Sequence, residues 1–217
     1  MGFDQGEGAV EVDRELPLHV QRGLRRAQLE RAAGSVFVAK GYHATRMDDI
    51  ARMAGVSKPV LYQHFSSKLE LYLVILQGHV DTLVTDVRSA LGSSVDNERR
   101  VRAAVQAYFD FVDQDVQGYR LVFDSDGTGE PAVRLRVLRA VDDCVSAVCE
   151  IVSSSTSLGV YQSRALAISL VGASQRAAQD WLEAGRPVSK REAVDSLVSL
   201  FWGGLSAMPL LWIGEPA

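Results

Sequence analysis

Residues 41–76 read GYHATRMDDIARMAGVSKPVLYQHFSSKLELYLVIL, and this stretch decides the fold. Thr45, Ser57 and Ser67 each stand just before a run with helical spacing. Hydroxyl side chains are preferred at such N-cap positions, where they accept a hydrogen bond from a free backbone N–H. Gly55 lies between the first two signals and permits the positive φ of a tight turn. The stretch therefore predicts two short helices joined by a tight turn, followed at once by a third helix.

Acidic residues and a proline strengthen these helix starts. Asp48 and Glu70 stand three positions after their expected N-cap residues, which is the spacing of a capping box. Pro59 lies in the first turn of the second short helix, where its missing N–H costs no intrahelical hydrogen bond. Leucine and valine then recur every three or four residues over residues 69–91. We therefore expect the third helix to be long.

Helical patterns extend from this stretch toward both ends of the chain. Before it, a helix over residues 21–40 should end at Lys40 and Gly41, a cation followed by a C-cap glycine. After it, Ser189 and Glu192 form a further capping box. No alternating run long enough for a sheet occurs, so we predict an all-α chain. Its other helices are expected over residues 101–112, 118–123, 130–152, 166–182 and 189–202.

The charge of the chain is unevenly distributed. The 217 residues carry a formal net charge of −4, with 47% hydrophobic and 23% charged residues, which is typical of a globular protein. By segment the charge is −4 over residues 1–13, +5 over residues 14–70 and −5 over residues 71–217. This asymmetry is expected when one small module contacts an anion such as the DNA backbone. Chance clustering on a solvated face is the alternative.

Two short helices behind a supporting helix have the layout of a helix-turn-helix module. The pair can pack through its apolar side chains, which leaves the opposite face of the second helix open to solvent. Lys58, Tyr62 and Gln63 lie on that face and suit phosphates and base edges in a major groove. Lys68 begins the next helix, where its charge opposes the helix dipole. A phosphate contact would explain a lysine at that position.

The same stretch resembles the N-terminal DNA-binding domain of the TetR family of transcriptional regulators. The matching elements are Gly41-Tyr42, Thr45, Asp49-Ile50-Ala51, Ala54-Gly55-Val56-Ser57, Leu61-Tyr62, His64-Phe65 and Lys68 to Leu71. Residues 1–20 hold Gly, Asp, Glu and one Pro with little periodicity, so we expect a flexible tail there. The resemblance implies a helix-turn-helix domain over 21–68 and a helical ligand-binding and dimerisation domain over 69–217. It also implies a transcriptional regulator whose partner is double-stranded operator DNA.

The family pattern places several residues of this chain at DNA-contact positions. Thr45 and Ser57 could equally be caps only, His64 could satisfy a neighbouring helix, and Tyr62 could be half-buried. Pro59 departs from the small residue that many family members carry, which leaves base readout at that position open. The full set is Thr45, Arg46, Ser57, Lys58, Pro59, Tyr62, His64 and Lys68.

Three segments are similar to one branch of the family, the actinobacterial regulators of fatty-acid synthesis of the FasR type. They are VSKPVLYQHF (56–65), VQAYFDFVDQDVQGYRLVFDSD (105–126) and WGGLSAMP (202–209). This likeness implies control of fatty-acid or lipid biosynthesis genes and a response to long-chain acyl-CoA as effector, without a bound cofactor. The alternative is a TetR-type repressor of efflux or catabolic genes that responds to another apolar small molecule.

The resemblance also places an apolar ligand cavity among the helices of the C-terminal domain. An apolar lining suits a long acyl chain, which needs a dry tunnel and few polar groups. Each lining residue could equally be plain core. The expected lining residues are Val80, Val105, Tyr108, Phe109, Val112, Phe123, Leu138, Val141, Val145 and Val171. Arg120, Arg134, Arg136 and Arg139 could meet the phosphates of CoA or simply lie on the solvated surface.

The last two long helices suggest a homodimer. Residues 166–182 combine several small residues, including Gly172, with Trp181, and this pattern suits close helix packing. The resemblance implies a four-helix dimer bundle made by this segment and the last helix, with burial in a single core as the alternative. Helix-turn-helix proteins usually bind as dimers, which pair two recognition helices across two half-sites.

Other classes of protein are disfavoured by missing patterns. The histidines have no metal-ligand spacing, and neither a phosphate-binding loop nor a Gly-x-Ser-x-Gly elbow occurs, so we expect no enzyme and no metal site. No run of about eighteen apolar residues is present and the N-terminus lacks a signal-peptide pattern, so we expect a cytoplasmic protein with no membrane partner. Cys144 and Cys149 are expected to be small core residues.

Overall fold

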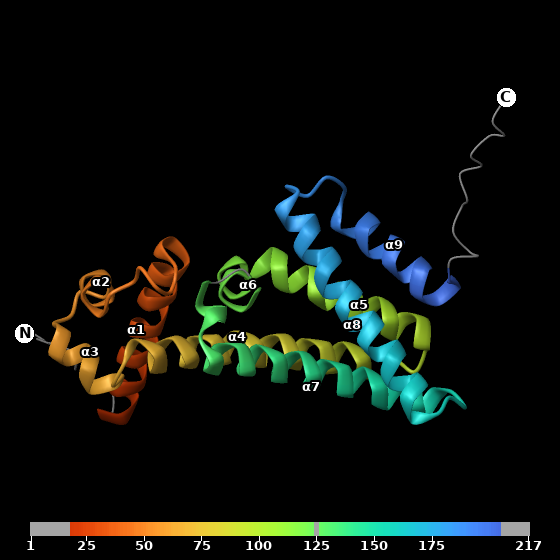
Figure 1. Cartoon of the computed structure of the whole chain (residues 1–217), viewed down its shortest axis with the longest axis horizontal. Helices are drawn as coiled ribbons and strands as arrows, with labels where there is room; N and C mark the ends of the chain where they lie inside the picture. Colours follow the sequence, from red (N-terminus) through yellow and green to blue (C-terminus); the bar gives the residue numbers. More distant parts are fainter. Residues whose placement is uncertain (1–17, 124–125, 205–217) are drawn as a thin grey trace, which may run out of the picture.

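The computed structural model describes residues 18–123 and 126–204, which form nine α-helices, one short 3-10 helix and no strand (Figure 1). The prediction of an all-α chain is confirmed for these residues. The helices are α1 (Leu18–Lys40), α2 (Met47–Met53), α3 (Lys58–His64), α4 (Lys68–Gly92), α5 (Asn97–Gln114), α6 (Val116–Phe123), α7 (Pro131–Ser155), α8 (Val160–Glu183) and α9 (Lys190–Gly203), with the 3-10 helix at Asp126–Gly129.

Two expectations lie partly outside the described residues. Of the expected tail over residues 1–20, residues 1–17 are not described and residues 18–20 already belong to α1. The segment 202–209, which carries part of the FasR-type likeness, is described only as far as residue 204. The predicted division into domains at residue 68 falls at the first residue of α4.

Helices α1, α2 and α3 form a small cluster at one end of the molecule (Figure 1). Leu29, Phe37, Ile50, Leu61 and Phe65 are almost completely buried and hold the three helices together. The turn between α2 and α3 passes through Gly55 with φ +67°, as the sequence predicts. A backbone hydrogen bond of 3.0 Å from the N–H of Val56 to the carbonyl of Ala51 closes this turn. The predicted helix-turn-helix is therefore present.

The start of α2 differs from the expected capping box by one residue. Thr45 is only 1% exposed, and its hydroxyl donates to the carbonyl of Gly41 at 2.6 Å instead of capping α2. Arg46 is the N-cap, and its N–H donates to the carboxylate of Asp49 at 3.2 Å. Asp49 also pairs with Lys40 at 3.0 Å. The expected pair of Thr45 and Asp48 is therefore wrong, because Thr45 turns inward to satisfy the end of α1.

The other helix starts agree better with the sequence. Ser67 accepts a hydrogen bond from the N–H of Glu70 at 3.1 Å, and Ser189 accepts one from Glu192 at 3.2 Å. Ser57 is the N-cap of α3, but its side chain makes no capping hydrogen bond. The hydroxyl of Ser57 therefore stays at the exposed surface of the turn.

Helix α4 joins the small cluster to the rest of the molecule, running from α1 along the length of α7 (Figure 1). Its buried side chains form one continuous stripe from Leu71 to Leu91. Helix α6 lies where the two parts meet and contacts both α1 and α4. The hydroxyl of Tyr72 on α4 donates to the carbonyl of Leu121 on α6 at 3.1 Å.

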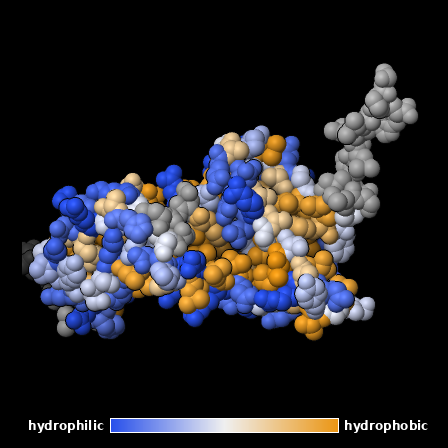
Figure 2. Space-filling model, in the orientation of Figure 1, coloured by the Kyte–Doolittle hydropathy of each residue, from blue (hydrophilic) through white to orange (hydrophobic). Residues whose placement is uncertain are grey.

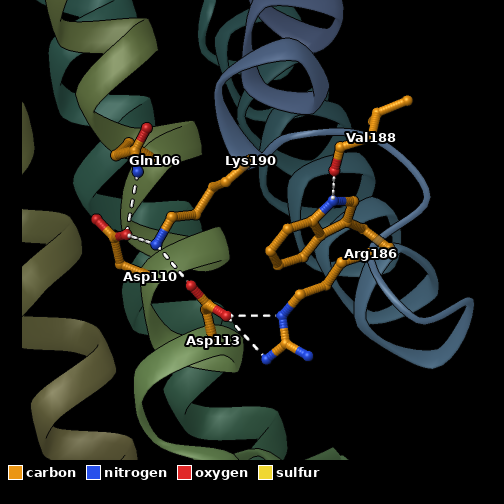
Figure 3. A network of polar contacts seen from close by, with 7 residues as sticks. Gln106, Asp110, Asp113, Arg186, Val188 and Lys190 are labelled. Carbon is orange, nitrogen blue, oxygen red and sulfur yellow. Dashed lines mark hydrogen bonds and ion pairs between the residues drawn. The ribbon is translucent and has the colours of Figure 1, made fainter.

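A polar network fixes the connection between α8 and α9 onto α5 (Figure 3). The ammonium of Lys190 donates to Asp110 at 2.7 Å and to Asp113 at 2.8 Å. Arg186, which has a positive φ of 61°, donates to the same carboxylate of Asp113 at 2.9 Å. Lys190 and then Arg186 hold the pKa of Asp113 below its usual value. Trp181 donates to the carbonyl of Val188 at 2.8 Å, so the connection is anchored at both ends.

The turn glycine can be tested against a helical glycine in the same chain. A Cβ added at Gly55 or at Gly78 would meet no other atom within 4 Å, so only the backbone conformation separates the two sites. We expect Gly55→Ala to lower the free energy of unfolding by about 1 kcal/mol, because an L-residue is strained at positive φ. Gly78→Ala should raise it by about 0.5–1 kcal/mol, because alanine is the better helix former. Urea unfolding of both variants checks this, and a shift in the same direction for both would contradict it.

Candidate nucleic-acid interface

The outer face of α3 is the centre of the candidate interface. Leu61 is buried and fastens α3 to α1 and α2, which turns the other side of the helix toward solvent. Lys58, Pro59 and Tyr62 are exposed on that side, and Gln63 is exposed next to them. Tyr62 is 43% exposed, so it is open to a ligand instead of being part of the core. The face carries a cation, a phenol and an amide, all of which can donate hydrogen bonds.

Lys58 already has an anionic neighbour. Its ammonium lies 2.9 Å from the carboxylate of Asp48 in α2, and both side chains are about half exposed. The hydrogen bond to Asp48 raises the pKa of Lys58, so the lysine stays charged at neutral pH. An exposed ion pair contributes about 0–1 kcal/mol. Lys58 can therefore exchange this carboxylate for a phosphate at little cost.

Helix α1 contributes arginines that the sequence analysis did not single out. Arg22 and Arg25 are exposed and line a groove of about 530 Å³ together with Gln63 and His64 of α3. The sequence signal that could have found them is the run RGLRR at residues 22–26, inside the basic segment. This run adds positive charge beside the recognition face.

Arg26, the third arginine of this run, contacts other residues of the protein. The guanidinium of Arg26 lies 4.3 Å from the centre of the Phe65 ring and donates to the carbonyl of His64 at 3.2 Å. It also pairs with Glu30 at 3.0 Å. Arg26 therefore holds the end of α3 against α1, and His64 is only half-buried at this junction.

Two of the predicted DNA-contact residues have side chains that are already hydrogen-bonded within the protein. Thr45 is buried and its hydroxyl is engaged, so the structure does not favour the expected contact by its side chain. The ammonium of Lys68 donates to the carbonyls of Tyr42, His43 and Thr45. The expected phosphate contact of Lys68 is therefore not supported, because its three donors are used inside the protein. Arg46, Ser57, Lys58, Pro59 and Tyr62 are the predicted contact residues that the structure leaves exposed.

The predicted ligand-lining residues lie mostly inside the C-terminal body. Val80, Val105, Tyr108, Phe109, Val112, Val145 and Val171 are buried in one continuous core cluster, and Phe123 and Val141 pack against it. Burial, together with the neighbouring Cys144 thiol, raises the pKa of the Tyr108 hydroxyl above its usual value. Leu138 is 59% exposed and lies off the buried stripe of α7, which passes through Val133, Ala140 and Cys144, so its place in a ligand cavity stays a prediction.

A groove between α4 and α7 is open to solvent next to this core. It has a volume of about 450 Å³, and Val80, Val84 and Ala140 form its apolar part. Arg136 and Arg139 lie along it, and Arg136 donates to the side-chain oxygen of Gln77 at 2.6 Å. Asp81 and Asp143 also line the groove. The groove therefore combines an apolar floor with a polar rim of both signs.

Apolar side chains are exposed on the outer sides of α8 and α9, and Figure 2 shows further apolar patches over the region of α7. Leu166 and Ile168 on α8 are 52% and 51% exposed, and Trp202 on α9 is 54% exposed. None of the described helices is long and apolar enough to cross a membrane. The described part of the chain also contains no group of three side chains that could hold a metal ion.

Known proteins are similar to this chain in sequence. Residues 29–75 match the family model "Bacterial regulatory proteins, tetR family". Residues 86–211, more than half of the chain, match the model "Tetracyclin repressor-like, C-terminal domain". The HTH-type transcriptional activator FasR of Mycolicibacterium smegmatis is 52% identical over 189 residues, which cover 87% of this chain and 86% of that protein.

Solved structures share the fold over most of their length. A TetR-like transcriptional regulator from Rhodococcus sp. RHA1 is 29% identical with a TM-score of 0.71, covering 88% of this chain and 99% of that one. FadR from Bacillus subtilis, solved in complex with stearoyl-CoA, is 14% identical with a TM-score of 0.70, covering 82% and 98%. The chain belongs to the TetR family of bacterial regulatory proteins, and it is a transcriptional regulator, not an enzyme.

Proposed function

We propose that the protein binds operator DNA at genes of fatty-acid or lipid biosynthesis and changes its operator affinity when it binds a long-chain acyl-CoA. The observation that carries this proposal is the 52% identity with FasR, which covers 87% of the chain and so includes the C-terminal body. A likeness limited to the helix-turn-helix would fit any TetR-type repressor equally well. The stearoyl-CoA complex of FadR supports the proposal, because the same fold accommodates an acyl-CoA.

DNA binding would use α3 for base readout and its neighbours for the phosphates. Tyr62 and Gln63 offer uncharged donors to base edges, while Lys58 lies at the start of the same helix. Arg22 and Arg25 of α1 lie beside the other end of α3 and suit phosphate contacts. Phosphate contacts fix the position of a protein on DNA, and base contacts give sequence specificity.

Lys58 and its acidic neighbour give a paired test of this surface. Lys58→Ala should weaken binding to all DNA sequences and lower the salt slope of binding by about 0.9, because one phosphate contact is lost. Asp48→Asn should strengthen binding, because the carboxylate 2.9 Å from Lys58 no longer competes with phosphate. Arg99→Ala changes an exposed arginine on α5; it is the control and should change neither quantity. Fluorescence anisotropy over a salt series measures all three, and an unchanged slope for Lys58→Ala would remove Lys58 from the interface.

The effector would place its acyl chain in the apolar body and its CoA phosphates at the α4–α7 groove. Val80 belongs both to the buried core of α4 and to the lining of this groove, so the groove leads to the expected ligand-lining residues. Arg136 and Arg139 can pair with phosphates there. An effector of this kind acts by binding one arrangement of the helices more tightly than another.

Operator binding in the presence of effector tests this step. A long-chain acyl-CoA should change operator affinity about 5–150-fold, the usual range of coupling between two sites. Arg139→Gln should raise the acyl-CoA concentration needed for this change without altering affinity for the operator alone. Arg134→Gln is the matched control, because Arg134 is exposed on the same helix and does not line the groove. An operator affinity that ignores acyl-CoA would exclude this effector, and a normal response of Arg139→Gln would exclude the groove.

A homodimer formed through α8 and α9 would complete the DNA-binding unit. The exposed apolar side chains of Leu166, Ile168 and Trp202 give these helices a surface that a second copy can cover. Gly172 on α8 is exposed and has open space above it, which allows another helix to approach closely. Two copies would then present two α3 helices to successive half-sites of the operator.

A charged side chain in this surface should prevent pairing. Ile168→Glu is expected to produce a folded monomer at micromolar concentration, because a dimer would bury the new carboxylate in an apolar interface. Operator affinity should fall with it, since a single half-site binds weakly. Met53→Glu changes an apolar residue on α2 that is 61% exposed, against 51% for Ile168, and should leave the dimer intact. Sedimentation velocity decides the matter, and a dimeric Ile168→Glu protein would contradict the proposed interface.

A further inference from the structure

Lys68 occupies an unfavourable position for a cation. It is the first residue of α4, directly after the N-cap Ser67. The helix dipole places positive charge at this end, so a lysine here is repelled unless something compensates. The compensation comes from inside the protein.

The ammonium of Lys68 turns back toward the loop between α1 and α2. It donates to the carbonyl of Tyr42 at 2.8 Å, to that of Thr45 at 3.1 Å and to that of His43 at 3.3 Å. It also lies 4.4 Å from the centre of the Tyr42 ring, within range of a cation–π contact. An ammonium has three N–H donors, so these carbonyls use all of them. Lys68 could bind a phosphate only after its hydrogen bonds to these carbonyls are broken.

The loop between α1 and α2, whose carbonyls accept these hydrogen bonds, is the part of the chain that sets the start of α2. Gly41 ends α1 with a positive φ of 79°, and the Thr45 hydroxyl closes the loop on the carbonyl of Gly41. Asp49 in the first turn of α2 binds both the N–H of Arg46 and the side chain of Lys40. The loop is thus fixed to α1 and α2 by these bonds, and it is fixed to α4 by Lys68.

We propose that Lys68 is a positioning residue that locks the α1–α2 loop onto α4, and so sets the orientation of the helix-turn-helix relative to the ligand-binding body. It acts on DNA through the placement of α2 and α3 and makes no phosphate contact of its own. This inference rests on the proposed binding of operator DNA. Without the lock, the helix-turn-helix keeps its charge but loses its fixed orientation.

The full-length protein with Lys68→Met and with Lys68→Arg tests the proposal. Both variants should bind the operator about tenfold more weakly, with the salt slope and the affinity for a duplex lacking the operator unchanged. A general loss of folded protein would lower both affinities equally, so their ratio is the informative quantity. The Lys68→Arg variant distinguishes a positioning role from a phosphate contact. Arginine binds phosphate at least as well as lysine, but its donors lie in a planar fork that does not fit three converging carbonyls.

Two results would overturn the proposal. One is a Lys68→Arg protein with normal operator affinity beside a Lys68→Met protein whose salt slope falls by about 0.9, because this pattern marks a phosphate contact. The other comes from amide hydrogen exchange on the free protein, which needs no DNA. The proposal expects faster exchange in α2 of Lys68→Met than in wild type, and unchanged exchange would contradict it. If the wild type binds no DNA, the proposed function fails while the exchange result still decides the role of Lys68.

Discussion

The burial of one side of α4 along its whole length is the constraint on which the rest of the structure depends. Its 25 residues span about 37 Å at 1.5 Å per residue. Near its start Leu71 and Tyr72 pack into the core of α1, and farther on Leu83 and Val87 pack against α5 and α7. The same helix therefore packs into both ends of one continuous core. A shift of α4 at one end must be accommodated at the other, which couples the DNA-binding end to the far end of the helix.

Helix α6 gives the body a second contact with the small N-terminal cluster. Asp115 caps α6 by accepting from the N–H of Gly118 at 2.8 Å, and its other oxygen lies 2.5 Å from His79 of α4. A Cβ at Gly118 would overlap both the carboxylate and the imidazole, so this junction requires glycine. On the other side the Gln117 amide packs directly on Gly34 of α1. A rearrangement of α6 thus alters contacts with α1 and α4 together.

The sequence was sufficient to predict the helices and the helix-turn-helix, because caps and apolar periodicity are local signals. It could not assign the roles of Thr45 and Lys68, since these depend on where the carbonyls of an irregular loop point. Leu138 shows a second limit. Apolar residues mark two stripes on α7, one through Leu135 and Leu138 and one through Val133 and Ala140, and only packing against α4 and α8 decides which is buried. The contacts between the N-terminal helices and the C-terminal body also join residues far apart in the sequence, so local patterns could not predict them either.

The structure also changes how the basic segment, residues 14–70, is interpreted. Several of its cations already have partners within the protein: Lys40 pairs with Asp49, Arg26 pairs with Glu30, and Lys68 donates to loop carbonyls. Arg22 and Arg46 are exposed and form no ion pair within the described residues; Arg22 lies on α1, and Arg46 lies directly before α2. Net charge therefore overstates what this segment can offer to phosphates. Affinity for DNA would come from a few flanking arginines and from Lys58, while the largely uncharged outer face of α3 is left to distinguish one base sequence from another.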